Sequence, residues 1–119
     1  MKAILLISHG SRSAKTKEEV LALIADLKNR TGISIFECAF LEIEQPSIPE
    51  GIDRCIAKGA DEVTVLLNFL NSGRHVNHDI PYILREAAER HPKGNISISS
   101  PVGQHPKIAD LFVDLIQHA

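Results

Sequence analysis

The stretch Lys2-Ala-Ile-Leu-Leu-Ile-Ser-His-Gly-Ser-Arg12 begins with a continuous apolar run and ends in a polar turn. Because every residue from Ala3 to Ile7 is apolar, the run predicts a strand that is buried on both faces, as is typical of parallel sheets. The turn places candidate functional residues at the carboxyl end of this strand: Ser8, His9, Gly10, Ser11 and Arg12.

The rest of the chain repeats the strand-then-helix pattern. Segments 34–39, 62–67 and 95–99 are rich in Ile, Val and Thr and are predicted strands. Amphipathic helical stripes cover 20–27, 80–88 and 108–116. Ser47-Ile-Pro-Glu50 has the form of a capping box, which predicts a shorter helix beginning there. The order βαβαβαβα predicts one α/β domain over residues 1–119, with a four-stranded parallel sheet, right-handed crossovers and helices on both faces.

Composition narrows the class of protein. The 119 residues are 44% hydrophobic and 24% charged, as in ordinary globular proteins. The first apolar run is too short for a signal peptide or a membrane span, so a cytoplasmic location is expected. Cys38 and Cys55 lack the close spacing of a zinc knuckle and are expected to be reduced thiols. The net charge of -2 gives no reason to expect nucleic-acid binding.

All strand-to-helix loops of a parallel sheet open at the carboxyl edge, where ligands of open α/β folds bind. His9 follows the first strand, Glu42 the second and His75 the third. The topology therefore predicts that these three side chains, from separate loops, converge.

His9 and His75 are the strongest candidates for proton transfer or metal binding, because a neutral imidazole does either near neutral pH. His9 precedes Gly10, which lets the backbone turn sharply and a large ligand approach. His75 precedes a helix predicted to begin near Asn77 or Asp79, and the positive end of that helix disfavours a charged imidazole. The alternative for both is an ordinary loop histidine that hydrogen-bonds to a neighbour.

Other polar and aromatic residues fall at the same edge. Glu42 completes a set of two histidines and one carboxylate that suits cobalt, iron, nickel or zinc, although it is equally placed to be a solvated loop acid. Phe40 and Phe69 end their strands where an aromatic face can lie against a flat macrocycle, with core packing as the alternative. Arg12 and Arg74 are suited to pairing with ligand carboxylates, or they are plain surface charges.

Four motifs follow one another along nearly the whole chain: Leu5-Leu-Ile-Ser-His-Gly-Ser-Arg12, Phe40-Leu-Glu42 with Gln45-Pro-Ser-Ile48, Phe69-Leu-Asn-Ser-Gly-Arg-His75 with Asp79-Ile-Pro81, and Gly103-Gln-His-Pro106. In this order they resemble the short CbiX-type sirohydrochlorin chelatases. The resemblance implies that His9 and His75 contact the metal and assist its insertion, with Glu42 nearby. One departure is the more polar third-strand loop. The family usually has Pro and Leu at Leu67 and Asn68 and a small residue at Arg74, so the identity of the ring substrate stays open.

The resemblance implies insertion of a divalent metal, cobalt before nickel or iron, into sirohydrochlorin or a related tetrapyrrole, in cobalamin, sirohaem or related biosynthesis. The metal is a substrate, and no organic cofactor is expected. His9 and His75 would hold the metal against the ring and accept the pyrrole protons, while Glu42 neutralises the metal or orients a histidine. The resemblance also implies a homodimer, in which two copies build the cleft. Expected ring contacts are Ser8, Gly10, Ser11, Arg12, Phe40, Phe69, Ser72, Gly73 and Arg74, with backbone N–H groups of residues 8–11 holding ring carboxylates.

Two other functions fit part of the pattern. Histidine phosphatases also carry His-Gly after a first strand, but Ser8 stands where that family has an arginine, and the chain is short for the usual acid-carrying insertion. A metal or tetrapyrrole carrier would use the same histidines without turnover, and only a rate separates it from a catalyst.

Overall fold

The computed structural model describes all 119 residues as alternating strands and helices. In chain order the elements are β1 (Lys2–Ser8), α1 (Ala14–Thr31), β2 (Ile35–Phe40), α2 (Ile48–Ala57), β3 (Glu62–Leu67), the π-helical turn η1 (His75–Asp79), α3 (Ile80–Arg90), β4 (Asn95–Pro101), the 3-10 turn η2 (Val102–Gln104) and α4 (Ile108–His118). The predicted order βαβαβαβα is confirmed. The predicted strand boundaries are correct to within two residues.

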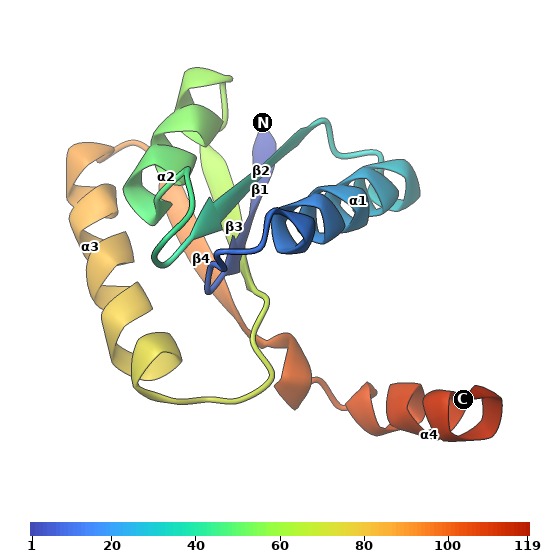
Figure 1. Ribbon diagram of the computed structural model, residues 1–119. Helices are drawn as coiled ribbons and strands as arrows, with labels where there is room; N and C mark the ends of the chain where they lie inside the picture. The colour runs from blue at the N-terminus through green and yellow to red at the C-terminus, as the bar shows by residue number, and fades with distance from the viewer.

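The four strands form one parallel sheet in the order β2-β1-β3-β4 (Figure 1). β1 lies between β2 and β3, and its residue Ala3 pairs with Ile35 on one side and with Val63 on the other. This central position explains the continuous apolar run, because both faces of β1 are covered. The carboxyl ends of all four strands point to the same edge of the sheet, as predicted.

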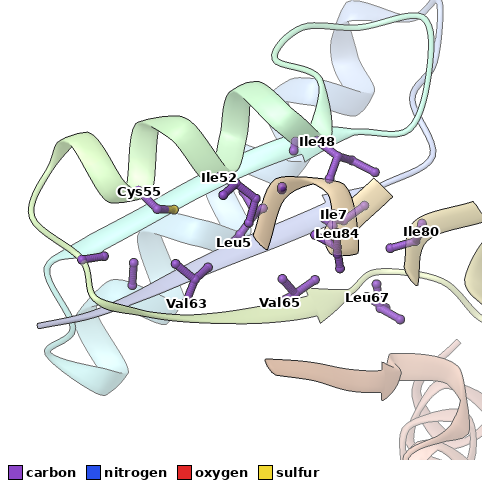
Figure 2. Packing of buried hydrophobic residues seen from close by; sticks show 14 of the residues in the cluster. Leu5, Ile7, Ile48, Ile52, Cys55, Val63, Val65, Leu67, Ile80 and Leu84 are labelled. Carbon is purple, nitrogen blue, oxygen red and sulfur yellow. The ribbon is translucent and has the colours of Figure 1, made fainter. Parts of the chain in front are cut away.

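The larger core lies between the sheet and the two helices α2 and α3 (Figure 2). Leu5 and Ile7 of β1 and Val65 of β3 are fully buried here. Ile52 of α2 and Ile80 of α3 cover them from above, also with no exposed surface. The helical stripe predicted over 80–88 therefore faces the sheet.

The opposite face of the sheet is covered by α1 alone (Figure 1). Val20 and Ile24 pack on alternate residues of the neighbouring strands, including Leu6 and Phe40. Other members of the predicted stripe point outward, and Leu23 is 42% exposed. Since α1 lies over β1 and β2, part of this face beside β3 and β4 has no helix on it.

The last helix departs from the predicted arrangement. The apolar stripe of α4 was expected to help cover the sheet, but α4 projects from the body of the molecule (Figure 1). None of its residues is buried, and Leu115 and Ile116 are 62% and 78% exposed. The sequence pattern correctly predicts an amphipathic helix, because periodicity reports an apolar face. It does not say what the face packs against.

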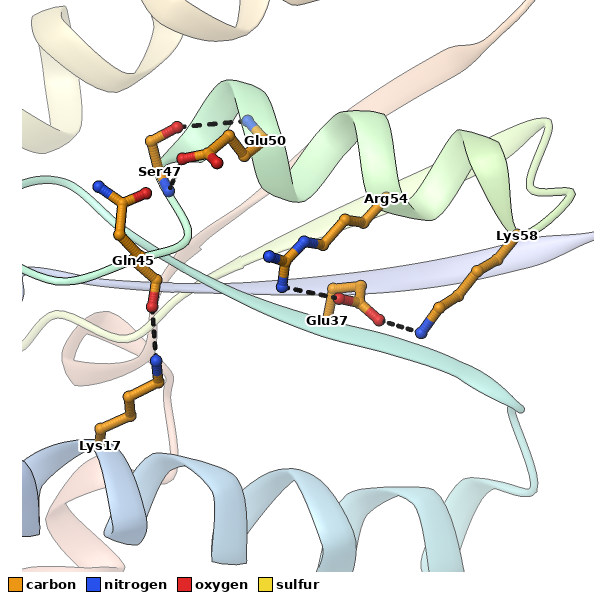
Figure 3. A network of polar contacts seen from close by, with 7 residues as sticks. All are labelled: Lys17, Glu37, Gln45, Ser47, Glu50, Arg54 and Lys58. Carbon is orange, nitrogen blue, oxygen red and sulfur yellow. Dashed lines mark hydrogen bonds and ion pairs between the residues drawn. The ribbon is translucent and has the colours of Figure 1, made fainter.

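Polar contacts fix the start of α2 and its position on the sheet edge (Figure 3). The Ser47 hydroxyl accepts from the Glu50 N–H, and the Glu50 carboxylate accepts from the Ser47 N–H, so the predicted capping box is present. Glu37 of β2 forms ion pairs with Arg54 and Lys58 of α2. These contacts anchor α2 to β2, so the loop between the two elements is held at both ends.

Two further findings bear on chemistry. Cys38 and Cys55 are both free and buried, as expected for reduced thiols. Burial raises the pKa of the Cys55 thiol to about 11, so this thiol is neutral near pH 7. No helix in the structure has both the length and the apolar character needed to cross a bilayer.

Candidate active site at the carboxyl edge of the sheet

Backbone hydrogen bonds continue the β1–β2 pairing beyond the strands and bring His9 to Glu42. The Leu41 N–H donates to the Ser8 carbonyl at 2.9 Å, and the Glu42 N–H donates to the His9 carbonyl at 3.1 Å. The two side chains then meet, with His9 Nε2 lying 3.0 Å from Glu42 Oε1. Their contact therefore follows from strand register rather than from chance proximity of two loops.

Gly10 allows this close approach of the two loops. Its φ is +106°, and a Cβ at this position would lie 1.9 Å from the Glu42 carbonyl oxygen. Only a residue without a side chain fits between the loops. The sequence predicted that Gly10 lets the backbone turn sharply and lets a ligand approach. In the structure, the space beside Gly10 is occupied by the Glu42 backbone.

His75 lies at the first residue of the π-helical turn, where Asp79 fixes its ring. The turn is closed by the Ile80 N–H, which donates to the His75 carbonyl. One carboxylate oxygen of Asp79 lies 2.8 Å from His75 Nδ1, and the other lies 3.2 Å from His78 Nδ1. Hydrogen bonds from His75 and then His78 lower the pKa of the Asp79 carboxyl, so Asp79 is ionised at neutral pH.

An ionised carboxylate only accepts hydrogen bonds, so Nδ1 of His75 carries a proton and Nε2 is the nitrogen left for another partner. The sequence reasoning considered only the helix end beside His75 and missed Asp79. The available signal was the spacing of four residues between His75 and Asp79, which places two side chains on the same side of a helical turn.

The structure brings the predicted trio together. The ring centroids of His9 and His75 are 5.6 Å apart and tilted by 58°. Each of the three side chains is about half exposed, so an external ligand can reach them. No group of three or more His, Cys, Asp or Glu side chains is already assembled around one metal position. The arrangement is an open, partly formed site, in contrast to the closed ligand sets of structural zinc.

The 3.0 Å spacing of His9 Nε2 and Glu42 Oε1 is compatible with one shared metal ion. Nitrogen and oxygen ligands each lie about 2.1 Å from such an ion, and two of them at a right angle are about 3.0 Å apart. The ring centroid of His75 lies 5.6 Å from that of His9, which makes His75 a candidate third ligand. The site therefore offers His9 and Glu42 as two ligands and His75 as a candidate third ligand, and it leaves the other coordination positions of the metal open.

Two residues of the first loop are structural rather than available to a ligand. Ser8 is only 6% exposed, and its hydroxyl accepts from the Asn68 side-chain amide at 3.0 Å. The Ser11 N–H donates to a Glu44 carboxylate oxygen at 2.8 Å. The contact of Ser11 with Glu44 corrects the expectation that all N–H groups of residues 8–11 are free for ring carboxylates. Ser11 at least is already paired.

The two candidate aromatic residues differ. Phe40 is 1% exposed and belongs to the core beneath α1, so it has no surface to present to a macrocycle, and its predicted ring contact is corrected. Strand register decides which face of the sheet the Phe40 side chain points to. A position at the end of a strand does not by itself specify that face. Phe69 packs against the other core but is only partly buried, and it stays a candidate.

The remaining predicted ring contacts are exposed and uncommitted. Arg12 and Arg74 make no ion pair in the structure, and both lie at the edge that carries the histidines. Ser72 and Gly73 are exposed in the loop before His75, and a Cβ at Gly73 would meet nothing within 4 Å. This loop therefore has room for a ligand, unlike the loop around Gly10.

Known proteins similar to this chain match it along nearly its whole length. A family model described as CbiX matches residues 3–119. The chain is 32% identical over 116 residues to a sirohydrochlorin ferrochelatase of Priestia megaterium, covering 98% of this chain and 44% of that protein. It is 34% identical over 131 residues to a sirohydrochlorin cobaltochelatase of Methanothermobacter thermautotrophicus, covering 98% of this chain and 91% of that protein.

The fold also matches a solved structure. The sirohydrochlorin chelatase SirB from Bacillus subtilis subspecies spizizenii, solved in complex with cobalt, superposes with a TM-score of 0.88 at 31% identity. The match covers 98% of this chain and 50% of that chain. The chain likewise spans between 39% and 51% of the length of four of the curated relatives that it matches.

Proposed function

The chain belongs to the CbiX family, and we propose that it inserts a divalent metal ion into sirohydrochlorin or a closely related tetrapyrrole. The observation that carries the proposal is the meeting of His9, Glu42 and His75 at one open edge of the sheet. Cobalt is the first choice of metal, with iron and nickel as alternatives, because imidazole and carboxylate ligands suit all three. The reaction takes place in the cytoplasm and serves the synthesis of cobalamin, sirohaem or a related cofactor.

Metal insertion makes two chemical demands, and the site meets both. The aqua ion must exchange water for other ligands, and the tetrapyrrole must lose two N–H protons as the metal enters. His9 and Glu42 replace water on the metal, while the open coordination positions face the ring. Nε2 of His75, freed by the Asp79 contact at Nδ1, accepts a proton or joins the metal.

The ring itself needs anchors for its carboxylates and a surface for its face. The unpaired guanidinium groups of Arg12 and Arg74 are suited to bidentate pairing with carboxylates. The open loop with Ser72 and Gly73 and the partly exposed Phe69 lie beside His75. One copy of the chain provides one wall of this site, and a second copy supplies the other in a homodimer.

The test is the rate of metal insertion, followed by the visible spectrum of sirohydrochlorin with cobalt, iron or nickel. The protein should raise the initial rate well above the background without protein. His9→Ala and His75→Ala should each lower this rate at least about 100-fold, because each removes a ligand or base. The melting temperature should change little, since both side chains lie outside the core.

His78→Ala is the matched control, because His78 is an exposed histidine of the same turn that contacts the other oxygen of Asp79. It should keep most of the wild-type rate. A wild-type protein that binds metal and tetrapyrrole but leaves the rate at background would be a carrier. Full activity in His9→Ala or His75→Ala would remove that residue from the mechanism.

A further inference from the structure

The loop after β2 holds Ile43 in an unfavourable backbone conformation. Its φ is +73°, and no other residue except glycine has a positive φ in the structure. The Glu44 N–H donates to the Glu42 carbonyl at 2.8 Å, which closes a three-residue turn with Ile43 at its centre. A turn of this kind with a positive central φ is rare and strained. A β-branched residue is least suited to it, whereas glycine or asparagine adopts a positive φ more readily.

The Ile43 side chain does not offset this strain by packing in the fold. It is 58% exposed, and it belongs to neither of the two clusters of buried residues. Leu41, two residues earlier, does pack against the larger core. Strained residues that the surrounding structure holds in place gather at binding sites, so Ile43 is a candidate ligand contact.

Contacts on both sides of Ile43 fix the turn. The Glu42 N–H donates to the His9 carbonyl at 3.1 Å, and a Glu44 carboxylate oxygen accepts from the Ser11 N–H at 2.8 Å. The loop is therefore held against the loop after β1 at two points. It places Ile43 directly after Glu42, at the edge of the sheet that carries the candidate metal ligands.

A second exposed apolar side chain lies in the loop on the other side of the His9 loop. The Asn68 N–H donates to the Ile7 carbonyl at 2.8 Å, so the β1–β3 pairing continues into the loop after β3. Leu70 in this loop is 60% exposed, while its carbonyl accepts from the Gln104 side-chain amide at 3.0 Å. The His9 loop thus lies between two loops that are each held through the backbone and each expose one apolar side chain.

We propose that Ile43 and Leu70 are specificity-determining contacts to the apolar face of the tetrapyrrole, an inference that rests on the proposed chelatase function. Sites for flat organic ligands combine a mainly apolar lining with a few polar groups. Phe40 is buried in the core and does not supply this lining. Ile43 and Leu70 would support the ring on either side of His9. The strain at Ile43 is then retained for binding at the expense of stability.

The variant Ile43→Asn separates the strain from the contact. It should melt at least about 2 °C above the wild-type protein, because asparagine accepts the positive φ and the lost side chain is largely exposed. It should bind metal-free sirohydrochlorin at least about 10-fold more weakly, as followed by the visible spectrum of the ring. The KM for the ring in cobalt insertion should rise by a similar factor, with kcat changed less than about 3-fold, because the contact is equal in the ground state and the transition state.

Two further variants distinguish this contact from a general effect of asparagine. Leu21→Asn is the matched control, because Leu21 is 48% exposed in the middle of α1, outside the loops at this edge. It should leave KM unchanged and lower the melting temperature, since asparagine is a weak helix former. Leu70→Asn should raise KM as Ile43→Asn does, but without a gain in melting temperature, because Leu70 has no positive φ.

The outcomes separate this inference from the proposed function. An active wild-type protein whose KM is unchanged in Ile43→Asn would overturn the ring contact. A lower melting temperature in Ile43→Asn would overturn the retained strain, because Ile43 would then stabilise the fold. A wild-type protein without insertion activity would contradict the chelatase function, and the binding of metal-free sirohydrochlorin to Ile43→Asn would still decide the contact.

Discussion

At the scale of single residues, the site depends on how backbone and carboxylate contacts orient the two histidines. His9 is placed by strand register, and its Nε2 already contacts Glu42. His75 is placed by a π-helical turn, and Asp79 holds its Nδ1. A metal ion entering this site meets one nitrogen beside a carboxylate and a second nitrogen that is free.

Gly10 provides a direct test of the loop contact. Gly10→Ala should lower the free energy of unfolding by at least about 2 kcal/mol, because an alanine there has an unfavourable positive φ and also overlaps the Glu42 carbonyl. Urea denaturation measures the change. Gly32→Ala is the control, since Gly32 also has a positive φ but has nothing within 4 Å of its Cβ position, and it should cost about 1 kcal/mol. Equal losses in both variants would show that the close approach to Glu42 contributes nothing.

Residue-level sequence reasoning succeeded where position along a strand decides the outcome and failed where side-chain direction decides it. His9, Glu42 and His75 converge because parallel strands end at one edge. Phe40 ends its strand in the same way, but its side chain points into the core. Asp79 was named as a possible helix start and as part of a motif, but its contact with His75 was not predicted, although the spacing of four residues allows it.

At the scale of elements, strands and helix starts follow closely from local sequence. The segment 62–67 was predicted to the residue, because Val63, Val65 and Leu67 alternate on the buried face. The strand β4 extends two residues further than predicted, to Pro101. Ser100 and Pro101 have poor strand propensity and follow a register shift in the pairing with β3, which no local pattern predicts.

The capping box of α2 gives a prediction at this scale. Ser47→Ala should lower the free energy of unfolding by about 1 kcal/mol, because the hydroxyl that accepts from the Glu50 N–H is lost. Ser13→Ala is the matched control, since Ser13 is the N-cap residue of α1 but makes no side-chain cap hydrogen bond. Chemical denaturation should show a change within about 0.5 kcal/mol for that variant. A loss at Ser13 as large as the loss at Ser47 would contradict the capping account.

At the scale of the whole molecule, the sequence predicted the sheet and its layers but not the place of α4. Its apolar stripe is as clear as that of α3, yet α3 covers the sheet and α4 covers nothing within its own chain. The difference lies in the linker at Gly103 and Gln104, whose contacts with the loop after β3 are long-range and set the direction of the helix. Such contacts exist only once the sheet has formed, so local sequence patterns do not reveal them.

The layered fold explains why this edge is the reactive one. At the carboxyl ends of β1 and β2 the loops are held by backbone hydrogen bonds, while the side chains of His9 and Glu42 stay about half exposed. Such an edge can bind a metal without enclosing it. Release of the metal to a ring requires this openness, since a closed four-ligand site would retain it.

Calorimetric titration of the protein with cobalt(II) tests the central claim, which is that one metal ion binds between His9 and His75. The wild-type protein should bind one ion per site, and His9→Ala and His75→Ala should each weaken the affinity at least about 10-fold. Glu42→Gln should weaken it less than either histidine change, because the amide oxygen can still contact the ion. An affinity that is unchanged in both histidine variants would mean that the metal binds elsewhere and that this edge of the sheet is not the site of insertion.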